Sequence, residues 1–377
     1  MSPTVGVIGG GQLARMMIPP AVALEIELRV FADAPGLSAA LAATVVGDYR
    51  DVASVLAFAD GVDVVTFDHE HVPQAVLAAL VEHGIAVHPG PHALQFAQDK
   101  LAMRARLTEL AVPVPEWAAV ASVAQLEAFM AENAGAAVIK TPRGGYDGKG
   151  VRLVRDAGEA ADWFERAAAE GDGVLLAEEL VGFRRELSQV IARRPSGEVA
   201  LWPIVESIQR DGVCVETIAP APDSAGVLVG VAADIAITIA EQLDVTGVLA
   251  VELFHTTDER LLVNELAMRP HNSGHWTIDG STTSQFEQHL RAVLDLPLGA
   301  TGCRDPWSVM VNVFGGPASG RLSDRYGNAF ADQPTVKFHS YGKASRPGRK
   351  VGHVTAGGAD LEEAVFMARA AAAFLEN

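Results

Sequence analysis

A lysine and a run of glycines are spaced as a polyphosphate site requires. The apolar segment Val138-Ile139 ends at Lys140, and the next residues hold Gly144, Gly145, Gly148 and Gly150. Backbone amides of such a loop can close over phosphates, and Lys140 supplies a fixed positive charge. The spacing is not that of a Walker A loop. We therefore predict a phosphate-covering flap; the alternative is a surface hairpin whose glycines only allow the turn.

Two apolar segments downstream carry carboxylates. Glu252 lies in the segment Ala250–Phe254, while Asn264 and Glu265 lie in the segment Leu262–Leu266. If the two segments pair as antiparallel strands, the three side chains lie beside one another. Like charges are costly to bury together unless a cation lies between them, and hard oxygen ligands that face phosphates favour Mg²⁺. The alternative is that both glutamates face solvent.

Two further segments are rich in hydrogen-bond donors. In Met268–Thr277, the forked guanidinium of Arg269 suits a planar oxyanion such as bicarbonate, and His271 and Asn272 could position an acceptor amine, although such a histidine can also be structural. Near the C-terminus, four cationic residues crowd together in a chain of net charge -18, which favours phosphate binding over a merely solvated loop. These four are Lys343, Arg346, Arg349 and Lys350.

Composition limits the class of protein. A chain of 377 residues predicts two or three domains, and 47 acidic against 29 basic residues argue against nucleic-acid or anionic-membrane partners. Cys214 and Cys303 form no disulfide framework or zinc motif. Apolar runs stay shorter than the roughly 18 residues of a membrane span, and Val5–Ile8 leads into glycines rather than a signal-peptide core. We expect a protein of the cytoplasm.

Periodicity predicts the elements that position these residues. Residues 4–98 alternate short apolar runs with helical stretches, which is typical of a parallel sheet with covering helices. A helix over Gln98–Leu110 should end before Pro113, at a boundary. Residues 113–178 form a small α+β unit around the glycine loop, with helices over Val123–Asn133 and Ala157–Ala168. Longer antiparallel strands follow, among them Leu187–Arg193, Leu201–Ile208, Val213–Ala219, Gly247–His255 and Leu261–Leu266, with a helix over Val227–Leu243 and a final helix from Leu361.

A glycine motif follows the first predicted strand. Gly9, Gly10 and Gly11 lie between that strand and a helix, where bare N–H groups can receive a phosphate. Asp33 is spaced as the acid of a dinucleotide fingerprint, which keeps a nicotinamide-dependent oxidoreductase open as an interpretation. Alternatively, the glycines only allow a tight turn and close helix packing.

The order of the motifs resembles a known family. GGGQLARM, Gln98-Asp99-Lys100, GGYDGKG, Glu178-Glu179, VELF, NELAMRPHNSGHWT and RPGRKVGH follow one another as in the N5-carboxyaminoimidazole ribonucleotide synthetases of the ATP-grasp superfamily. The likeness runs from residue 5 to about 355. It implies a multidomain α/β and α+β fold: a Rossmann-like domain (1–98), an ATP-grasp domain (99–300, with a lid at about 113–178) and a small C-terminal domain (301–377).

The resemblance also implies a reaction. ATP, with Mg²⁺ or in its place Mn²⁺, would convert bicarbonate to carboxyphosphate, which carboxylates the amine of 5-aminoimidazole ribonucleotide in purine biosynthesis and leaves ADP and phosphate. The family implies a cytoplasmic homodimer. One rival is another ATP-grasp ligase for a ribonucleotide amine, which would lack RPHNSGHWT. A catalytically silent nucleotide-binding protein would lack an acid or lysine retained here, and an oxidoreductase leaves the flap and the acid pair unexplained.

Site residues carry over position by position from the resemblance. ATP would be bound by Lys100, Lys140, Gly144, Gly145, Tyr146, Asp147, Gly148, Lys149, Gly150, Glu178, Glu179, Leu180, Val181, Glu186, Asn264 and Glu265. The metal ligands would be Glu252 and Glu265. Catalytic roles fall to Tyr146, Asp147, Arg269, His271, Asn272 and Lys343. The substrate would contact Gln12, Leu13, Glu70, Arg269, His271, Lys343, Arg346 and Arg349. Two positions depart from the family pattern: in Phe67–His71 only Glu70 carries over, and Gln209 replaces a histidine.

Overall fold

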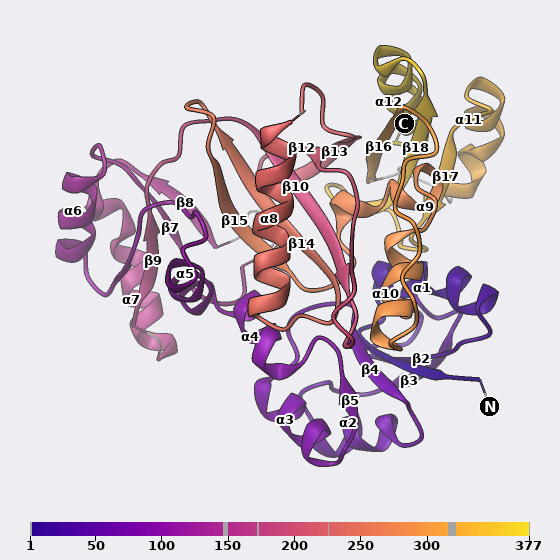
Figure 1. Cartoon of the computed structure of the whole chain (residues 1–377). Coiled ribbons are helices and arrows are strands. Elements are labelled where there is room, and N and C mark those ends of the chain that lie inside the picture. Colours follow the sequence, from indigo (N-terminus) through magenta and orange to yellow (C-terminus); the bar gives the residue numbers. More distant parts are fainter. Residues whose placement is uncertain (1, 146–149, 172, 225, 316–321, 377) are drawn as a thin grey trace.

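The strands of the protein form three sheets within the residues that the computed structural model describes, which are 2–145, 150–171, 173–224, 226–315 and 322–376. Figure 1 shows the N-terminal sheet at the base and the small lid sheet at one end, and the largest sheet runs from beside the lid to the C-terminal strands at the other end. The site described below lies where these parts meet.

The N-terminal sheet is parallel, as predicted. Its order is β3 (Ala43–Val46), β2 (Glu27–Ala32), β1 (Thr4–Ile8), β4 (Val64–Phe67) and β5 (Ala86–Val87). The accompanying helices are α1 (Gln12–Ala23), α2 (Val52–Ala59) and α3 (Gln74–Glu82). Strands β1 and β4 are buried along their whole length, which explains their continuous apolar sequences. Strand order reverses between β1 and β4, so ligands are expected at the carboxyl ends of these two strands.

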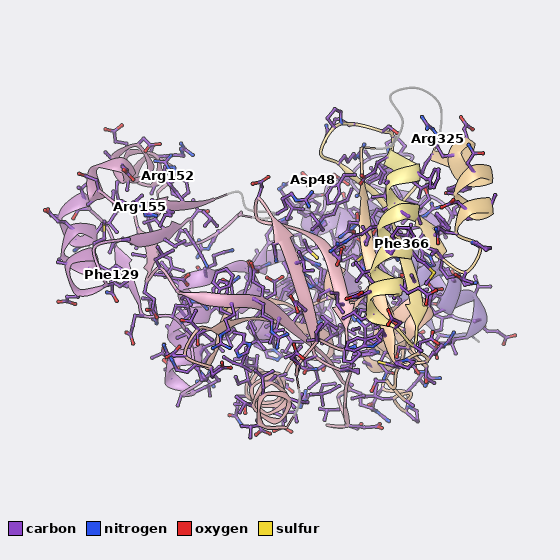
Figure 2. The ribbon with its side chains drawn as sticks, turned by 90° about the horizontal axis from the view of Figure 1, so that it is seen from above. Asp48, Phe129, Arg152, Arg155, Arg325 and Phe366 are labelled. Atoms are coloured by element: carbon purple, nitrogen blue, oxygen red, sulfur yellow. The ribbon has the colours of Figure 1, made fainter. Side chains whose placement is uncertain are left out.

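The lid sheet is antiparallel and small. Its order is β6 (Trp117–Val120), β9 (Leu175–Glu178), β7 (Ala137–Lys140) and β8 (Val151–Val154). Helices α6 (Val123–Glu132) and α7 (Ala161–Glu170) contribute Leu126, Phe129 and Trp163 to its core. Figure 2 shows Phe129, Arg152 and Arg155 at this end, far from Phe366 of the C-terminal helix. The lid therefore has a core of its own.

The largest sheet runs through the rest of the chain. Its order is β15 (Leu261–Ala267), β14 (Gly247–Thr256), β10 (Phe183–Arg193), β12 (Val205–Arg210), β13 (Val213–Ala219), β16 (Trp307–Phe314), β18 (Lys350–Gly358) and β17 (Lys337–Ser340), with β11 (Val199–Leu201) beside β10. Its helices are α8 (Val227–Gln242), α9 (Thr277–Gly280), α10 (Gln285–Val293), α11 (Tyr326–Asp332) and α12 (Leu361–Glu376). Strands β16, β17 and β18 of the C-terminal part of the chain thus extend the sheet that β10–β15 form. The domain boundaries at 98 and 300 stay predictions.

Some predicted elements need correction. The helix expected over Gln98–Leu110 is α5 (Lys100–Glu109), which begins after Asp99 because Asp99 is extended and caps α5 by accepting from the backbone N–H groups of Leu101 and Ala102. The helix before it, α4 (Pro91–Gln98), was not predicted. The strand expected over Leu201–Ile208 is interrupted after β11, where Pro203 has no N–H for a ladder. Strands β3 and β6 were not predicted at all.

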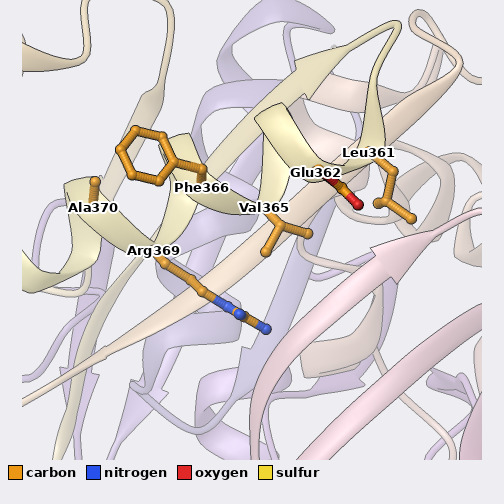
Figure 3. A pocket seen from close by; sticks show the side chains of 6 residues that line it. All are labelled: Leu361, Glu362, Val365, Phe366, Arg369 and Ala370. Carbon is orange, nitrogen blue, oxygen red and sulfur yellow. The ribbon is translucent and has the colours of Figure 1, made fainter.

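The outer face of α12 has a shallow hollow of about 500 Å³. Figure 3 shows its lining residues, which are Leu361, Glu362, Val365, Phe366, Arg369 and Ala370. It shares none of them with the cleft described below. Among the helices in the described parts of the chain, none is both long and apolar enough to cross a membrane.

A buried histidine joins the N-terminal sheet to the largest sheet. His289 of α10 lies with Nε2 2.7 Å from Thr66 Oγ1 of β4, and its Nδ1 accepts a hydrogen bond from the backbone N–H of Val248 in β14. Because Nδ1 accepts, the proton of the neutral ring lies on Nε2 and is donated to Thr66. Burial lowers the pKa of His289 to about 3. The joint therefore requires the neutral ring.

Acid should weaken this joint. The pKa of His289 is about 3 in the native protein and 6.5 ordinarily, so protonation favours unfolding and stability is lost as pH falls below 6.5. Between pH 6.5 and about 5, the loss from this group is roughly 2 kcal/mol. The variant His289→Gln keeps a donor and an acceptor but does not titrate. Its unfolding free energy, measured by urea denaturation, should fall less steeply as pH is lowered. The difference in slope should correspond to about one proton fewer taken up on unfolding. Equal slopes in the two proteins would contradict this prediction.

Candidate active site

One cleft of about 1640 Å³ gathers most of the predicted site residues. It lies between the lid, the hairpin β14–β15, the carboxyl ends of β1 and β4, and the basic segment 343–350. The predicted residues that line it are Gln12, Leu13, Glu70, Lys100, Lys140, Gly144, Gly145, Glu178, Glu179, Leu180, Val181, Glu186, Glu252, Asn264, Glu265, Arg269, His271, Asn272, Lys343, Arg346 and Arg349. Gly150, directly before β8, is not among them. Tyr146, Asp147, Gly148 and Lys149 lie outside the described residues.

A buried ionic cluster forms the floor of the phosphate side. Glu178 ends β9 and is 2% exposed; its Oε1 lies 2.5 Å from Arg104 Nε and its Oε2 lies 2.7 Å from Lys140 Nζ. The other end of Arg104, in α5, donates to the carbonyl oxygen of Asn264 in β15 at 2.7 Å. Four elements are therefore tied together through one arginine. The side chain of Glu178 anchors Lys140, so a ligand in the cleft would meet Glu178 mainly through its backbone.

The cluster carries more positive than negative charge. Burial raises the pKa of Glu178, but Lys140 and Arg104 outweigh burial and hold that pKa below its usual value. Burial lowers the pKa of Lys140, and the charge of Arg104 adds to this, against the attraction of Glu178. Two cations thus share one carboxylate. The surplus positive charge faces the cleft through Lys140, where an anion would neutralise it.

The hairpin places its three polar residues together, as the sequence predicted. Glu252 of β14 is the direct partner of Glu265 in β15, and the register then shifts by one residue. This bulge lets Asn264 and Glu265, although consecutive, both reach the cleft. Lys140 Nζ donates to Asn264 Oδ1 at 3.1 Å, and Lys100 Nζ lies 2.9 Å from Glu265 Oε1. Each lysine is thus held by the hairpin that carries the acids.

Glu186 of β10 has an unusual environment beside the hairpin. Burial, and then the neighbouring charge of Glu252, raise the pKa of Glu186 to about 7, although Lys140 and a hydrogen bond from Gln209 oppose the shift. The adjacent wall is apolar: Phe183 stacks on Phe254 at 4.8 Å between ring centroids, and Leu180 is exposed. A flat apolar wall beside an acid suits a planar base and a polyhydroxylated group.

Four polar residues line the opposite side of the cleft, namely Glu70, Arg269, His271 and Asn272. Arg269 Nε lies 2.7 Å from Glu70 Oε2, and this pairing outweighs burial in raising the pKa of Arg269. Within the described part of the chain, Glu70 Oε1 and both side-chain atoms of Asn272 are buried without a hydrogen-bond partner. Unpaired buried polar atoms are costly, so these atoms are suited to receive a ligand that pairs with them. His271 Nε2 lies 3.2 Å from Glu252 Oε1 and connects this side to the hairpin.

The glycine motif requires a correction. Asp68, directly after β4, accepts hydrogen bonds from the backbone N–H groups of Gly11 and Ala14 at 2.8 Å each. A Cβ at Gly11 would lie 2.1 Å from the Asp68 carboxylate, so only glycine fits there. Two of the amides that could have received a phosphate, those of Gly11 and Ala14, are therefore occupied by a carboxylate. This weakens the case for a dinucleotide at this helix.

The basic segment reaches the cleft beside α1. Lys343 Nζ donates to Gln12 Oε1, and Arg349 Nη1 donates to the carbonyl oxygen of Ala344 at 3.3 Å. Arg346 is exposed, whereas Lys343 and Arg349 are half-buried. The phosphate-binding side chains predicted here thus come together with Gln12 and Leu13 at one end of the cleft.

Sequence reasoning missed two residues that matter for this geometry. Arg104 lies one helical turn after Lys100, so the two share a face of α5, and that spacing was the available signal. Asp68 was noted only as a departure from a family pattern. Its role depends on the parallel pairing of β1 with β4, in which Ile8 lies opposite Phe67. No pattern within the segment itself shows that pairing.

Family models match most of the chain. The ribonucleotide synthetase preATP-grasp domain matches residues 1–98, the ATP-grasp domain matches residues 105–286, and the phosphoribosylaminoimidazole carboxylase C-terminal domain matches residues 308–365. These matches fall on the parts of the fold that contribute to the cleft.

Named relatives agree with these matches. The N5-carboxyaminoimidazole ribonucleotide synthase of Mycobacterium tuberculosis is 49% identical, covering 100% of this chain and 89% of the relative, and that of Corynebacterium ammoniagenes is 48% identical, covering 100% and 92%. The synthetase structure from Thermus thermophilus superposes with a TM-score of 0.88 at 37% identity, covering 99% of each chain. The Aspergillus clavatus synthase, solved with ADP and 5-aminoimidazole ribonucleotide, superposes with a TM-score of 0.88 at 30% identity, covering 99% and 98%. The chain therefore belongs to the N5-carboxyaminoimidazole ribonucleotide synthase family.

Proposed function

We propose that this cleft binds MgATP, bicarbonate and 5-aminoimidazole ribonucleotide through the residues named above. The protein is an ATP-dependent ligase of purine biosynthesis that carboxylates the amine of 5-aminoimidazole ribonucleotide. One observation supports this assignment of residues. The hairpin residues Glu252, Asn264 and Glu265 line the same cleft as the donor segment Arg269–Asn272. Phosphoryl activation and acceptor binding both have their groups within that space.

The part of the cleft that binds ATP places two positive charges beside the phosphates. Lys100 and Lys140 hold the phosphates, and Glu186 accepts hydrogen bonds from the ribose hydroxyls beside the apolar wall. An oxygen of bicarbonate attacks the γ-phosphorus, the bond to the bridging oxygen of ADP breaks, and carboxyphosphate forms. The two lysines neutralise charge on the transferred phosphoryl group and on the leaving ADP. Because Asn264 and Glu265 already orient both amines, little reorganisation accompanies the step.

The donor set of the hairpin fits Mg²⁺, with Mn²⁺ as a substitute. Within the described residues no three His, Cys, Asp or Glu side chains form a complete metal cage, and Glu252 and Glu265 supply two carboxylates. Mg²⁺ is usually held by one or two carboxylates together with substrate phosphates and water. When bound, it supplies further neutralisation of the phosphate oxygens. In this structure, Glu252 pairs with His271 and Glu265 pairs with Lys100.

The acceptor half lies on the other side of His271. Lys343 and Arg349 bind the phosphate of the ribonucleotide with Gln12 and Leu13 beside them, and Arg346 adds charge at the rim. Glu70, whose Oε1 is unpaired, accepts from the ribose, while its Oε2 holds Arg269 toward the carboxyl group. The amine attacks the carboxyl carbon of carboxyphosphate, phosphate leaves, and the amine loses a proton. His271 and Asn272 orient the amine during this attack.

Assembly and location stay predictions. We expect a homodimer in the cytoplasm, with small molecules rather than nucleic acid or membrane as ligands. The acidic balance, 47 acidic against 29 basic residues, supports the exclusion of polyanionic partners.

The function is tested by ADP release from MgATP. Release should need both bicarbonate and 5-aminoimidazole ribonucleotide for full rate, because the acceptor removes the carboxyl group and completes the reaction. The measurement is a coupled ADP assay in bicarbonate-containing and bicarbonate-depleted buffer, with and without the ribonucleotide. Release that is indifferent to the ribonucleotide would overturn the substrate, and other ribonucleotide amines would then be compared in the same assay.

Glu265→Gln should lower turnover on the order of 100-fold, because the loss of one carboxylate weakens metal binding and releases Lys100. Raising the Mg²⁺ concentration should restore part of the rate. Glu259→Gln is the matched control, since Glu259 lies in the turn of the same hairpin and its side chain is 58% exposed. Equal effects of the two variants, or a deficit that Mg²⁺ leaves unchanged, would refute the metal assignment.

Binding of ADP without divalent cations should strengthen as pH rises through about 7. The pKa of Glu186 is raised to about 7, so below that pH the carboxyl is protonated, and above it two oxygens become free to accept from the ribose. Calorimetric titration at several pH values measures the effect. In Glu186→Gln, binding should be weaker and should follow only the titration of ADP itself. Parallel pH profiles for the two proteins would contradict the ribose role.

A further inference from the structure

Gln285, the first residue of α10, makes an unusual set of contacts with the substrate segment. It is 0% exposed, its Oε1 accepts from the backbone N–H of His271 at 2.9 Å, and its Nε2 donates to the carbonyl oxygen of His271 at 2.7 Å. The same Nε2 lies 3.0 Å from Nδ1 of His275. One side-chain amide therefore binds both polar backbone groups of His271, and also the ring of His275, four residues later.

The surrounding residues hold the side-chain amide of Gln285 in one orientation. A Cβ on Gly274 would lie 2.3 Å from Gln285 Oε1, so the segment is a close fit around the side chain. Burial lowers the pKa of His275 well below its usual value, so the ring is neutral and Nδ1 accepts from Gln285. The side chain of His271 is held independently, by Ser273 Oγ at 2.9 Å from Nδ1 and by Glu252 at Nε2. Backbone and side chain of His271 are thus fixed by different partners.

The same helix contains a second amide with the same kind of clamp. Gln288, also 0% exposed, accepts from the backbone N–H of Gly299 at 2.7 Å and donates to its carbonyl oxygen at 2.7 Å. Gly299 does not line the cleft. Comparable buried glutamines therefore clamp two segments, and only one of the segments carries site residues.

We propose that Gln285 is a positioning residue for carboxyl transfer, which sets the backbone of His271 and thereby the place of His271 and Asn272 against the acceptor amine. The proposal rests on the proposed function of the cleft. Gln285 lines no part of the cleft itself, and of the residues that its side chain contacts, His271 is the one that lines the cleft. Displacements of about 1 Å in groups that orient reactants can lower rates roughly 100-fold.

In Gln285→Glu, the contact between this side chain and the backbone of His271 should depend on pH. A carboxylate oxygen in place of Nε2 would face the carbonyl oxygen of His271, which repels it. Burial favours the protonated acid, whose O–H restores a donor as pH falls. The titratable and charged groups that act on His275, which Gln285 contacts, are His271, Lys350, His339 and Arg269, and all are present in the control protein. Gln288→Glu places the same charge against Gly299 and costs stability without touching His271.

The experiment compares the ribonucleotide-dependent turnover of Gln285→Glu and Gln288→Glu, each divided by the wild-type rate at the same pH. At pH of about 8, Gln285→Glu should be slower on the order of 100-fold, and most of this deficit should disappear at pH of about 6. Gln288→Glu should stay within about threefold of wild type at both. ADP affinity, measured alongside, should be unchanged in both variants. Equal deficits in the two variants, or a deficit of Gln285→Glu that ignores pH, would overturn the proposal.

A neutral pair covers the case in which a buried charge prevents folding. Gln285→Met and Gln288→Met remove each clamp without adding charge. A loss of kcat with unchanged KM for ATP in Gln285→Met alone supports the positioning role, whereas equal losses overturn it. Absence of ribonucleotide-dependent turnover in the wild-type protein would instead count against the proposed function.

Discussion

The site depends on one buried interaction, the sharing of Glu178 between Arg104 and Lys140. Removing one partner of a buried ion pair typically costs about 3–5 kcal/mol, since it strands the others away from water. Here the partners come from α5, β9 and β7, and the guanidinium also holds β15 through the carbonyl oxygen of Asn264. The base of the lid and the acidic hairpin therefore cannot move apart without breaking this cluster. That constraint keeps Lys140 at the wall of the cleft.

Elsewhere in the cleft, other cations are also held by a neighbouring side chain, and these pairs are less buried. Lys100 is oriented by Glu265, Arg269 by Glu70, and Lys343 by Gln12, so the cations are placed before any substrate arrives. In a chain of net charge -18, anions reach a favourable potential only where such cations converge. Chemistry among ATP, bicarbonate and a phosphorylated acceptor brings negative charges together, and pre-oriented cations are what such a reaction needs.

Local patterns predicted most of the elements and many members of the site, and failed where the answer lies in pairing between distant segments. The strand ends at Lys140 and the hairpin of Glu252 and Glu265 were readable because period and charge coincide there. Strand β3 was missed because Ala43–Val46 is an exposed edge with little alternation. The capping of α5 by Asp99 was hidden inside a run that looked continuously helical. The position of Arg104 depends on its contact with Glu178, 74 residues further along the chain, and that of Gln285 depends on the turn that brings it back to His271.

The N-terminal domain shows how one carboxylate can separate two functions on one fold. Its strand order and glycine turn are those of a nucleotide-binding sheet, and fold alone would leave a dinucleotide enzyme open. Asp68 accepts from Gly11 and Ala14, the amides that a pyrophosphate would need, and a second anion there would meet a like charge. The proposed function places the nucleotide between the lid and the hairpin, and places the acceptor beside Gln12 at the start of α1. In chains of this topology, an acid directly after the strand that neighbours β1 is thus a physical reason to look for the nucleotide elsewhere.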